Sequence, residues 1–269
     1  MEPIMKKISQ LALTVSIASI LLFFSNSLYA QEGYYMHVDY IKIEKANLSD
    51  FMNNVESTFK PIQEARVENG SIEGWYLYRV AYRGTRNANY NYVVVSISDQ
   101  LLGFEDIYQQ IDGHFSESER DAIMDDYNRY LSPNHSELWI INNSVLVSDD
   151  AKPSRYFGMD YMQVPSGQEY AYQMMEDEVA RPLHESRMET DTMRGWELFS
   201  LITPGGTEYG YNFATGNYYN KLSDIEFGFT DEIIRANHPG TNINEFFEEI
   251  ERTRDLVRSE LWEIIDYVK

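Results

Sequence analysis

The sequence predicts an α+β protein made of two tandem copies of one unit, each with the order β-α-β-β-α-β. Three observations carry this prediction. Residues 39–99 align without a gap with residues 160–220 at a constant offset of 121. Segments with strand and helix periodicity recur in the same order in both copies. A distinct N-terminal segment sets where the first copy begins.

Matched residues run through the whole aligned stretch. The pairs are Asp39-Tyr40 with Asp160-Tyr161, residues 60–66 with 181–187, Gly74-Trp75 with Gly195-Trp196, Leu77 with Leu198, Gly84 with Gly205, and Tyr90-Asn91 with Tyr211-Asn212. At an offset of 123, Ser136-Glu137-Leu138-Trp139 recurs as Ser259-Glu260-Leu261-Trp262. So many matches in one register indicate a duplication.

The first copy contains every element of the unit. Strands are predicted at residues 35–43, 75–82, 90–97 and 137–147, and helices at residues 47–68 and 116–130. Pro61 predicts a kink or a new first turn in the first helix, and Asn69-Gly70 ends it. A polar turn near Gly84 separates the middle strands, and a capping box at Ser116 and Glu119 opens the second helix.

The second copy repeats this order with one interruption. Strands are predicted at residues 156–164, 196–203, 209–218 and 260–268, and the first helix at residues 168–189. Its second helical region is divided, because Asn237-His238-Pro239-Gly240 breaks it and Asn242 with Glu245 caps the next piece. We therefore expect the copies to differ most in their second helical regions.

The N-terminal segment has the order of a signal peptide. Lys6 and Lys7 precede an apolar run over residues 11–24, and Leu28-Tyr29-Ala30 precedes the polar chain. A retained membrane anchor is the alternative, but the run is short for a span of about 20 residues. We expect a signal peptide over residues 1–30, repeats over 31–150 and 151–269, and a periplasmic or secreted protein without membrane attachment after cleavage.

The charge and the cysteine content exclude several classes of binding partner and of covalent link. The chain carries a formal charge of −21 and no cysteine. Residues 1–30 hold Glu2, Lys6 and Lys7, so the mature part carries −22. This excess of acidic groups argues against binding to nucleic acid or anionic membranes. Disulfides are excluded, and so is lipid attachment at a signal-peptide cysteine.

The duplicated unit and the tryptophan at the head of its second strand (Trp75 and Trp196) resemble the dimeric α/β-barrel superfamily. This group of ferredoxin-like proteins includes NIPSNAP-like proteins and antibiotic-biosynthesis-type monooxygenases. The resemblance implies that two four-stranded antiparallel sheets pair into a barrel with the helices outside. Since both units lie in one chain, we expect a monomeric intrachain barrel, with oligomers possible in principle. The resemblance also implies a ligand pocket between each sheet and its own helices.

Two arginines are candidates to bind a ligand in that pocket. Arg66 and Arg187 continue the apolar face of each first helix. A guanidinium there must be paired or line a polar pocket. The structural alternative is an arginine bonded to backbone carbonyls or to a carboxylate. The nearby pairs Lys60/Glu64 and Arg181/Glu185 are spaced for surface ion pairs.

Three aromatic residues complete the candidate ligand site: Trp75, Trp196 and His184. Core packing is the alternative role for both tryptophans. His184 stands where the first copy has Gln63, and it is a weak candidate for catalysis because histidine titrates near neutral pH. Strand alternation places Trp196 toward the helices and Glu197 toward the space between the sheets.

The sequence contains no nucleophile, metal or nucleotide signature. The histidines do not match the placement expected of haem-degrading relatives, so we expect no cofactor and no metal. The leading interpretation is a protein that binds a small, largely apolar ligand. The alternatives are a cofactor-independent monooxygenase with His184, Arg187 and Trp196 around its substrate, or a structural role in which acidic helices bind other proteins.

Overall fold

The structure, a computed structural model, describes residues 33–147 and 152–269, so the predicted signal peptide lies outside the described residues. The first repeat contains β1 (Tyr35–Ile41), η1 (Lys45–Asn47), α2 (Leu48–Asn54), η2 (Val55–Phe59), α3 (Lys60–Glu68), β2 (Gly74–Tyr82), β3 (Tyr92–Ser98), η3 (Leu101–Phe104), α4 (Ile107–Gln110), α5 (Glu117–Tyr130) and β4 (His135–Leu146). The second contains β5 (Tyr156–Gln163), α6 (Glu169–Met175), η4 (Glu176–Ala180), α7 (Arg181–Glu189), β6 (Gly195–Thr203), β7 (Phe213–Tyr219), η5 (Leu222–Glu226), α8 (Asp231–Asn237), α9 (Ile243–Thr253) and β8 (Asp255–Val268).

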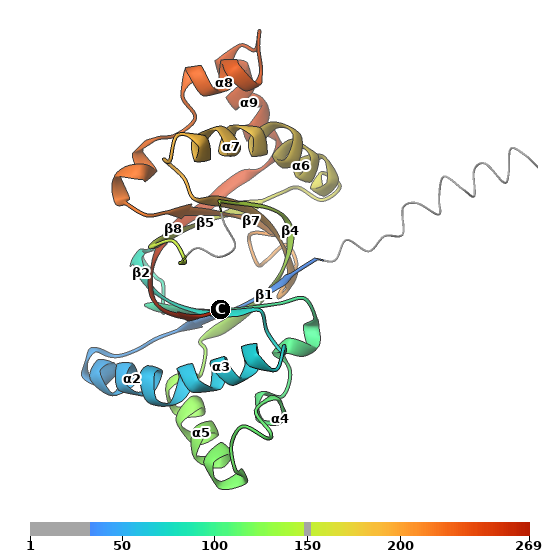
Figure 1. Cartoon of the computed structure of the whole chain (residues 1–269). Coiled ribbons are helices and arrows are strands. Elements are labelled where there is room, and N and C mark those ends of the chain that lie inside the picture. Colours follow the sequence, from blue (N-terminus) through green and yellow to red (C-terminus); the bar gives the residue numbers. More distant parts are fainter. Residues whose placement is uncertain (1–32, 148–151) are drawn as a thin grey trace, which may run out of the picture. The chain divides into compact units, whose positions relative to one another are not determined.

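The strands form one closed antiparallel barrel. Each repeat supplies a four-stranded sheet, in the orders β4-β1-β3-β2 and β8-β5-β7-β6. Pairing of β2 with β8 and of β4 with β6 joins the two sheets. Figure 1 shows α2 to α5 against one outer side of the barrel and α6 to α9 against the opposite side. The predicted intrachain barrel of two β-α-β-β-α-β units is confirmed.

The first helical region of each repeat contains a π-helical turn at the same repeat position. These turns, η2 and η4, directly precede α3 and α7, whose second residues are Pro61 and Pro182. Proline lacks the N–H that an α-helix would bond to the preceding turn, and the wider π-turn accommodates this loss. Pro61 therefore lies in a new first turn, one of the two predicted outcomes.

Of the two ion pairs predicted along these helices, one is wrong. Lys60 Nζ lies 2.6 Å from Asp266 Oδ1 of β8, and no ion pair between Lys60 and Glu64 occurs among the described residues. Arg181 Nε does lie 3.9 Å from Glu185 Oε1. The first helix therefore joins the barrel strand of the other repeat through Lys60.

The third strand of each repeat, β3 or β7, starts later than predicted, and the asparagine directly before it bonds through its side chain to the backbone that follows the first strand. Asn91 Oδ1 accepts from Ile43 N, and Asn91 Nδ2 donates to Ile43 O, both at 2.8 Å. Asn212 binds Val164 in the same way at 2.8 and 2.9 Å. β3 and β7 begin only after these residues. The last strand, β8, begins earlier than predicted because Asp255 still pairs with the end of β5.

The core has one layer inside the barrel and one under the helices of each repeat. The inner layer contains mainly aromatic side chains, among them Tyr40, Trp139, Phe157, Tyr161, Phe199 and Trp262. The outer layer of the first repeat joins Phe51, Phe59 and Ile62 to Trp75. In the second repeat Tyr172 and Trp196 belong to the corresponding layer, and Leu183 packs with α8 and α9. Large apolar side chains thus fill both outer layers.

Candidate functional site: a cavity at one end of the barrel

Buried carboxyl and tyrosine groups fill one end of the barrel, which we call the polar end. Glu137 of β4 is buried and accepts four hydrogen bonds. Its Oε2 accepts from Tyr40 at 2.7 Å and from Trp139 Nε1 at 3.1 Å. Its Oε1 accepts from Tyr209 at 2.5 Å and from Tyr211. Such a set of donors satisfies a carboxylate that burial would otherwise destabilise.

The second repeat places Glu260 of β8 at the equivalent position. Glu260 accepts from Tyr90 and, at 3.0 Å, from Trp262 Nε1. Arg258 Nε lies 3.6 Å from Glu260 Oε1. The Ser-Glu-Leu-Trp motif that recurs in the sequence therefore provides a buried acid and its indole donor in each repeat.

These two acids link the repeats crosswise. Tyr90 of the first repeat binds Glu260 of the second, and Tyr211 of the second binds Glu137 of the first. The hydroxyls of Tyr40 and Tyr161, which are also repeat equivalents, lie 2.7 Å apart. The residues matched in the sequence thus form the contact between the two sheets at this end.

A cavity of about 950 Å³ lies at the other end of the barrel. Starts of β1, β2, β5 and β6 and ends of β3, β4, β7 and β8 surround it. Its inner wall is mainly apolar and aromatic: Met36, Tyr76, Tyr78, Val95, Ile97, Ile141, Phe157, Tyr218 and Ile264. Buried rings of the inner core layer, including Trp139, Phe199 and Trp262, lie between the cavity and the polar end.

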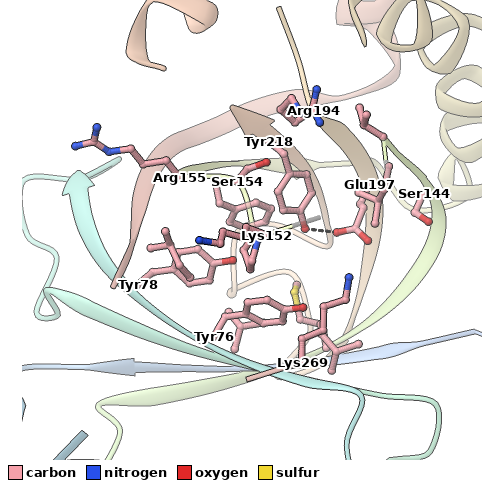
Figure 2. A pocket seen from close by; sticks show the side chains of 18 of the residues that line it. Tyr76, Tyr78, Ser144, Lys152, Ser154, Arg155, Arg194, Glu197, Tyr218 and Lys269 are labelled. Carbon is pink, nitrogen blue, oxygen red and sulfur yellow. Dashed lines mark hydrogen bonds between the residues drawn. The ribbon is translucent and has the colours of Figure 1, made fainter. Parts of the chain in front are cut away.

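Glu197 of β6 is the acidic group of the inner cavity wall. It is only 8% exposed, and the hydroxyl of Tyr218 on β7 donates to its Oε2. Figure 2 shows these two side chains meeting within the cavity. Burial raises the pKa of Glu197 to about 7, although the hydrogen bond from Tyr218 acts in the opposite direction. Glu197 can therefore accept or donate a proton near neutral pH.

Tyrosine hydroxyls are the other polar groups of the inner wall. Burial and the neighbouring Glu197 raise the pKa of Tyr76 to about 12, and burial raises the pKa of Tyr78 and Tyr218 well above the usual value. All three hydroxyls stay protonated at neutral pH. The inner wall thus offers hydrogen-bond donors and the carboxyl group of Glu197 to a bound molecule, while Glu73, the other acidic side chain that lines the cavity, is exposed.

Basic side chains lie at the mouth of the cavity: Lys152, Arg155, Arg194 and Lys269. Arg155 is paired with Glu263 at 2.9 Å, and Arg194 with Asp191 at 2.9 Å. Each arginine is therefore paired with a carboxylate, although Arg155 shares Glu263 with Arg79.

The two repeats contribute unequally to the cavity. Glu197 stands at the position of Tyr76 in the first repeat, and Tyr218 at the position of Ile97, at the offset of 121. The acid and its hydrogen-bonded tyrosine therefore occur once per chain, unlike the paired acids of the polar end.

No protein-family model and no curated protein sequence matches the chain. Among solved structures, a candidate monooxygenase from Fusobacterium nucleatum subsp. nucleatum ATCC 25586 is similar, with a TM-score of 0.53 and 8% identity over 89% of this chain and 95% of that chain. A candidate monooxygenase from Lactobacillus acidophilus NCFM has a TM-score of 0.48 and 9% identity over 88% of this chain and 96% of that chain. A chlorite dismutase variant from Candidatus Nitrospira defluvii has a TM-score of 0.49 and 9% identity over 90% of this chain and 95% of that chain.

The closed barrel and the first of these likenesses decide the fold. The chain has the dimeric α/β-barrel fold. At this level of identity the likeness concerns the fold alone, and function must be argued from the site.

The histidines of the chain, all within the described residues, lie away from the cavity lining. His184 is the most buried of them. Its ring stacks on Trp196 with centroids 5.3 Å apart and contacts Phe229 at 4.9 Å. His238 Nε2 lies 3.1 Å from the carbonyl oxygen of Val179. Neither lines the cavity, and the described residues contain no group of three or more potential metal ligands.

Arg66 lies under the helices of the first repeat with its guanidinium bonded within the protein. Its nitrogens donate to Gln63 Oε1 at 2.6 Å, Gln110 Oε1 at 2.9 Å and Gly103 O at 2.7 Å. Trp75 is fully buried in the same layer. This geometry corresponds to the structural alternative, an arginine bonded to carbonyl groups.

The structure brings together His184, Trp196 and Arg187 in the second repeat. His184 and Arg187 both contact the ring of Phe229, and His184 stacks on Trp196. Burial, followed by the charge of Arg187, lowers the pKa of His184 to about 3. None of the five candidates (Arg66, Trp75, His184, Arg187, Trp196) lines the barrel cavity. Ligand binding by them stays a prediction.

The inner wall of the cavity is not among the site residues that the sequence predicts. Alternation did place Glu197 between the sheets and Trp196 toward the helices, which the structure confirms. The signal was an acidic residue inside a strand, facing a side that the rest of the pattern fills with aromatic residues. No pattern in the sequence showed that this side is hollow at one end of the barrel.

Proposed function

We propose that this protein binds a small, largely apolar ligand in the cavity at one end of its barrel. The observation that supports this proposal is the cavity itself, which has a volume of about 950 Å³, an apolar and aromatic inner wall, and charged side chains at its mouth. Ligand sites of proteins have this size and composition. The resemblance to the dimeric α/β-barrel superfamily implied a ligand under the helices, but that layer of the first repeat is filled by packed side chains such as Phe51, Phe59 and Trp75.

A neutral fluorescent probe, N-phenyl-1-naphthylamine, tests this proposal. We expect saturable binding to the purified protein at one site per chain. Ile97→Trp fills the inner wall and should weaken binding at least about tenfold. His184→Gln, in the outer layer, should leave binding unchanged. Loss of binding in His184→Gln alone would move the site to the layer between sheet and helices.

An acid–base enzyme on the same scaffold is the second candidate function. The observation in its favour is Glu197, whose pKa near 7 suits a general base or acid at neutral pH. A cofactor-independent monooxygenase belongs to this class. Turnover of a bound compound that disappears in Glu197→Gln, with binding retained, would favour the enzyme.

The setting of this function is also part of the proposal. We infer that residues 1–30 direct export and that the mature protein acts in the periplasm or outside the cell. The order of charges and apolar residues at the N-terminus supports this. Because both sheets of the barrel come from one chain, a monomer can form the whole cavity.

A further inference from the structure

Resting on the proposed ligand site, we propose that its ligand is a small organic cation, an alkyl- or arylalkylammonium ion, held by the Glu197 carboxylate among aromatic rings. Two features of the cavity and one of the whole chain support this inference. They are a buried acid with no ion-pair partner among the described residues, the aromatic rings around it, and the net negative charge of the chain.

Glu197 has no cationic partner in the part of the chain that the structure describes. Its hydrogen bond comes from the neutral hydroxyl of Tyr218, and no ion pair of Glu197 occurs among residues 33–147 and 152–269. The side chain is more than nine-tenths buried and lines the cavity. A buried carboxylate without a counter-charge is strongly unfavourable, so a cation delivered by a ligand would be bound tightly.

The two buried acids of the polar end differ from Glu197 because several protein groups bind each of them. Glu137 has four donors, and Glu260 has Tyr90, Trp262 and the nearby Arg258. Their donors come from the protein itself, and neither acid lines the cavity. Glu197 is the buried acid that does.

Aromatic rings surround the volume in front of Glu197. Tyr76 and Tyr78 stack with centroids 6.3 Å apart, Tyr78 lies 5.9 Å from Phe157, and Phe157 lies 4.8 Å from Tyr218. Figure 2 shows the three tyrosines around the same space as Glu197. Ammonium groups bind favourably over such ring faces, and ring-lined cages are a common way to recognise organic cations.

The charge of the molecule favours the same ligand. A formal charge of −21 attracts cations and repels anions over a long range. At the mouth Arg155 and Arg194 are already paired with carboxylates. We therefore expect the ammonium group at the inner wall of the cavity, next to Glu197.

The test compares two probes of equal shape, 2-phenylethylammonium and 2-phenylethanol, as competitors of N-phenyl-1-naphthylamine at pH 8. At this pH Glu197 is mostly deprotonated, since its pKa is about 7. We expect the wild-type protein to bind the ammonium at least about tenfold more tightly than the alcohol. Glu197→Gln should remove this preference and keep the affinity for the alcohol.

Glu176→Gln is the matched control. Glu176 is also buried with a pKa of about 7, but it lies in η4 and does not line the cavity. The control should keep the full preference for the ammonium. If the wild-type protein binds the alcohol as tightly as the ammonium, the inference is overturned even if no variant folds. If the naphthylamine probe itself does not bind, the proposed site fails instead.

Discussion

The crosswise tyrosine–glutamate contacts at the polar end should contribute measurably to stability. Tyr211→Phe removes the hydroxyl that donates to Glu137 and accepts from Arg258 Nη2 at 3.1 Å. The ring remains, stacked parallel to Trp139 with centroids 6.2 Å apart. A lost hydrogen bond to a charged group costs about 1.5–3 kcal/mol. For a chain of this size we expect the melting temperature to fall by roughly 3–10 °C.

Urea unfolding followed by tryptophan fluorescence measures this loss. The midpoint should fall while the slope with denaturant stays constant, because the surface exposed on unfolding does not change. Tyr92→Phe is the matched control, since the ring of Tyr92 packs on Phe51 outside the barrel, and none of the hydrogen bonds described involves its hydroxyl. If Tyr211→Phe loses no more free energy of unfolding than this control, the crosswise contacts do not stabilise the pairing of the two sheets.

Three further predictions concern the whole chain. Residues 31–150 alone should dimerise or aggregate in sedimentation experiments, because the free repeat exposes the inner face of its sheet and the edges of β2 and β4; a well-behaved monomer would contradict this. The contribution of Glu197 to stability should fall as pH rises from about 4.5 to about 7, because folding raises its pKa and the folded state then binds more protons at this group than the unfolded one; the free energy of unfolding of wild-type protein relative to Glu197→Gln, measured with urea, should therefore be lower at pH 8 than at pH 5, and an equal difference at the two pH values would count against it. N-terminal sequencing of the exported protein should begin at or near Gln31, and retention of Met1 would refute cleavage.

The fold could be predicted because the duplication is visible in the sequence. A constant offset of 121 fixed which segments are equivalent, and the alternating and helical periods then gave one order for both copies. Strand starts were less accurate. The side chains of Asn91 and Asn212 bond to the backbone of Ile43 and Val164, which lie 48 residues away in the sequence, and periodicity does not reveal such contacts.

The role of the repeated motifs also depended on contacts across the whole chain. Glu137 and Glu260 recur in the sequence, but their donors Tyr211 and Tyr90 come from the other repeat. A single copy of the motif therefore gives no sign that its acid is satisfied. The same holds for Lys60, whose partner Asp266 lies in the last strand of the chain rather than one turn along its helix.

The candidate site was the least predictable part. A residue such as Arg66, on the apolar face of a helix, is equally compatible with a pocket and with bonds to Gln63, Gln110 and Gly103. Only the packing distinguishes them. A cavity depends on how the side chains of all eight strands fill the barrel, so its volume does not follow from the pattern of any one strand.

Mass spectrometry of the protein isolated without denaturation from its native cells or their medium tests the central claim most directly. We predict that wild-type protein carries a bound small molecule, up to one per chain, and that Ile97→Trp, which fills the cavity, carries none. Equal occupancy in the two proteins, or a ligand that disappears in His184→Gln but not in Ile97→Trp, would contradict the assignment of the barrel cavity as the binding site.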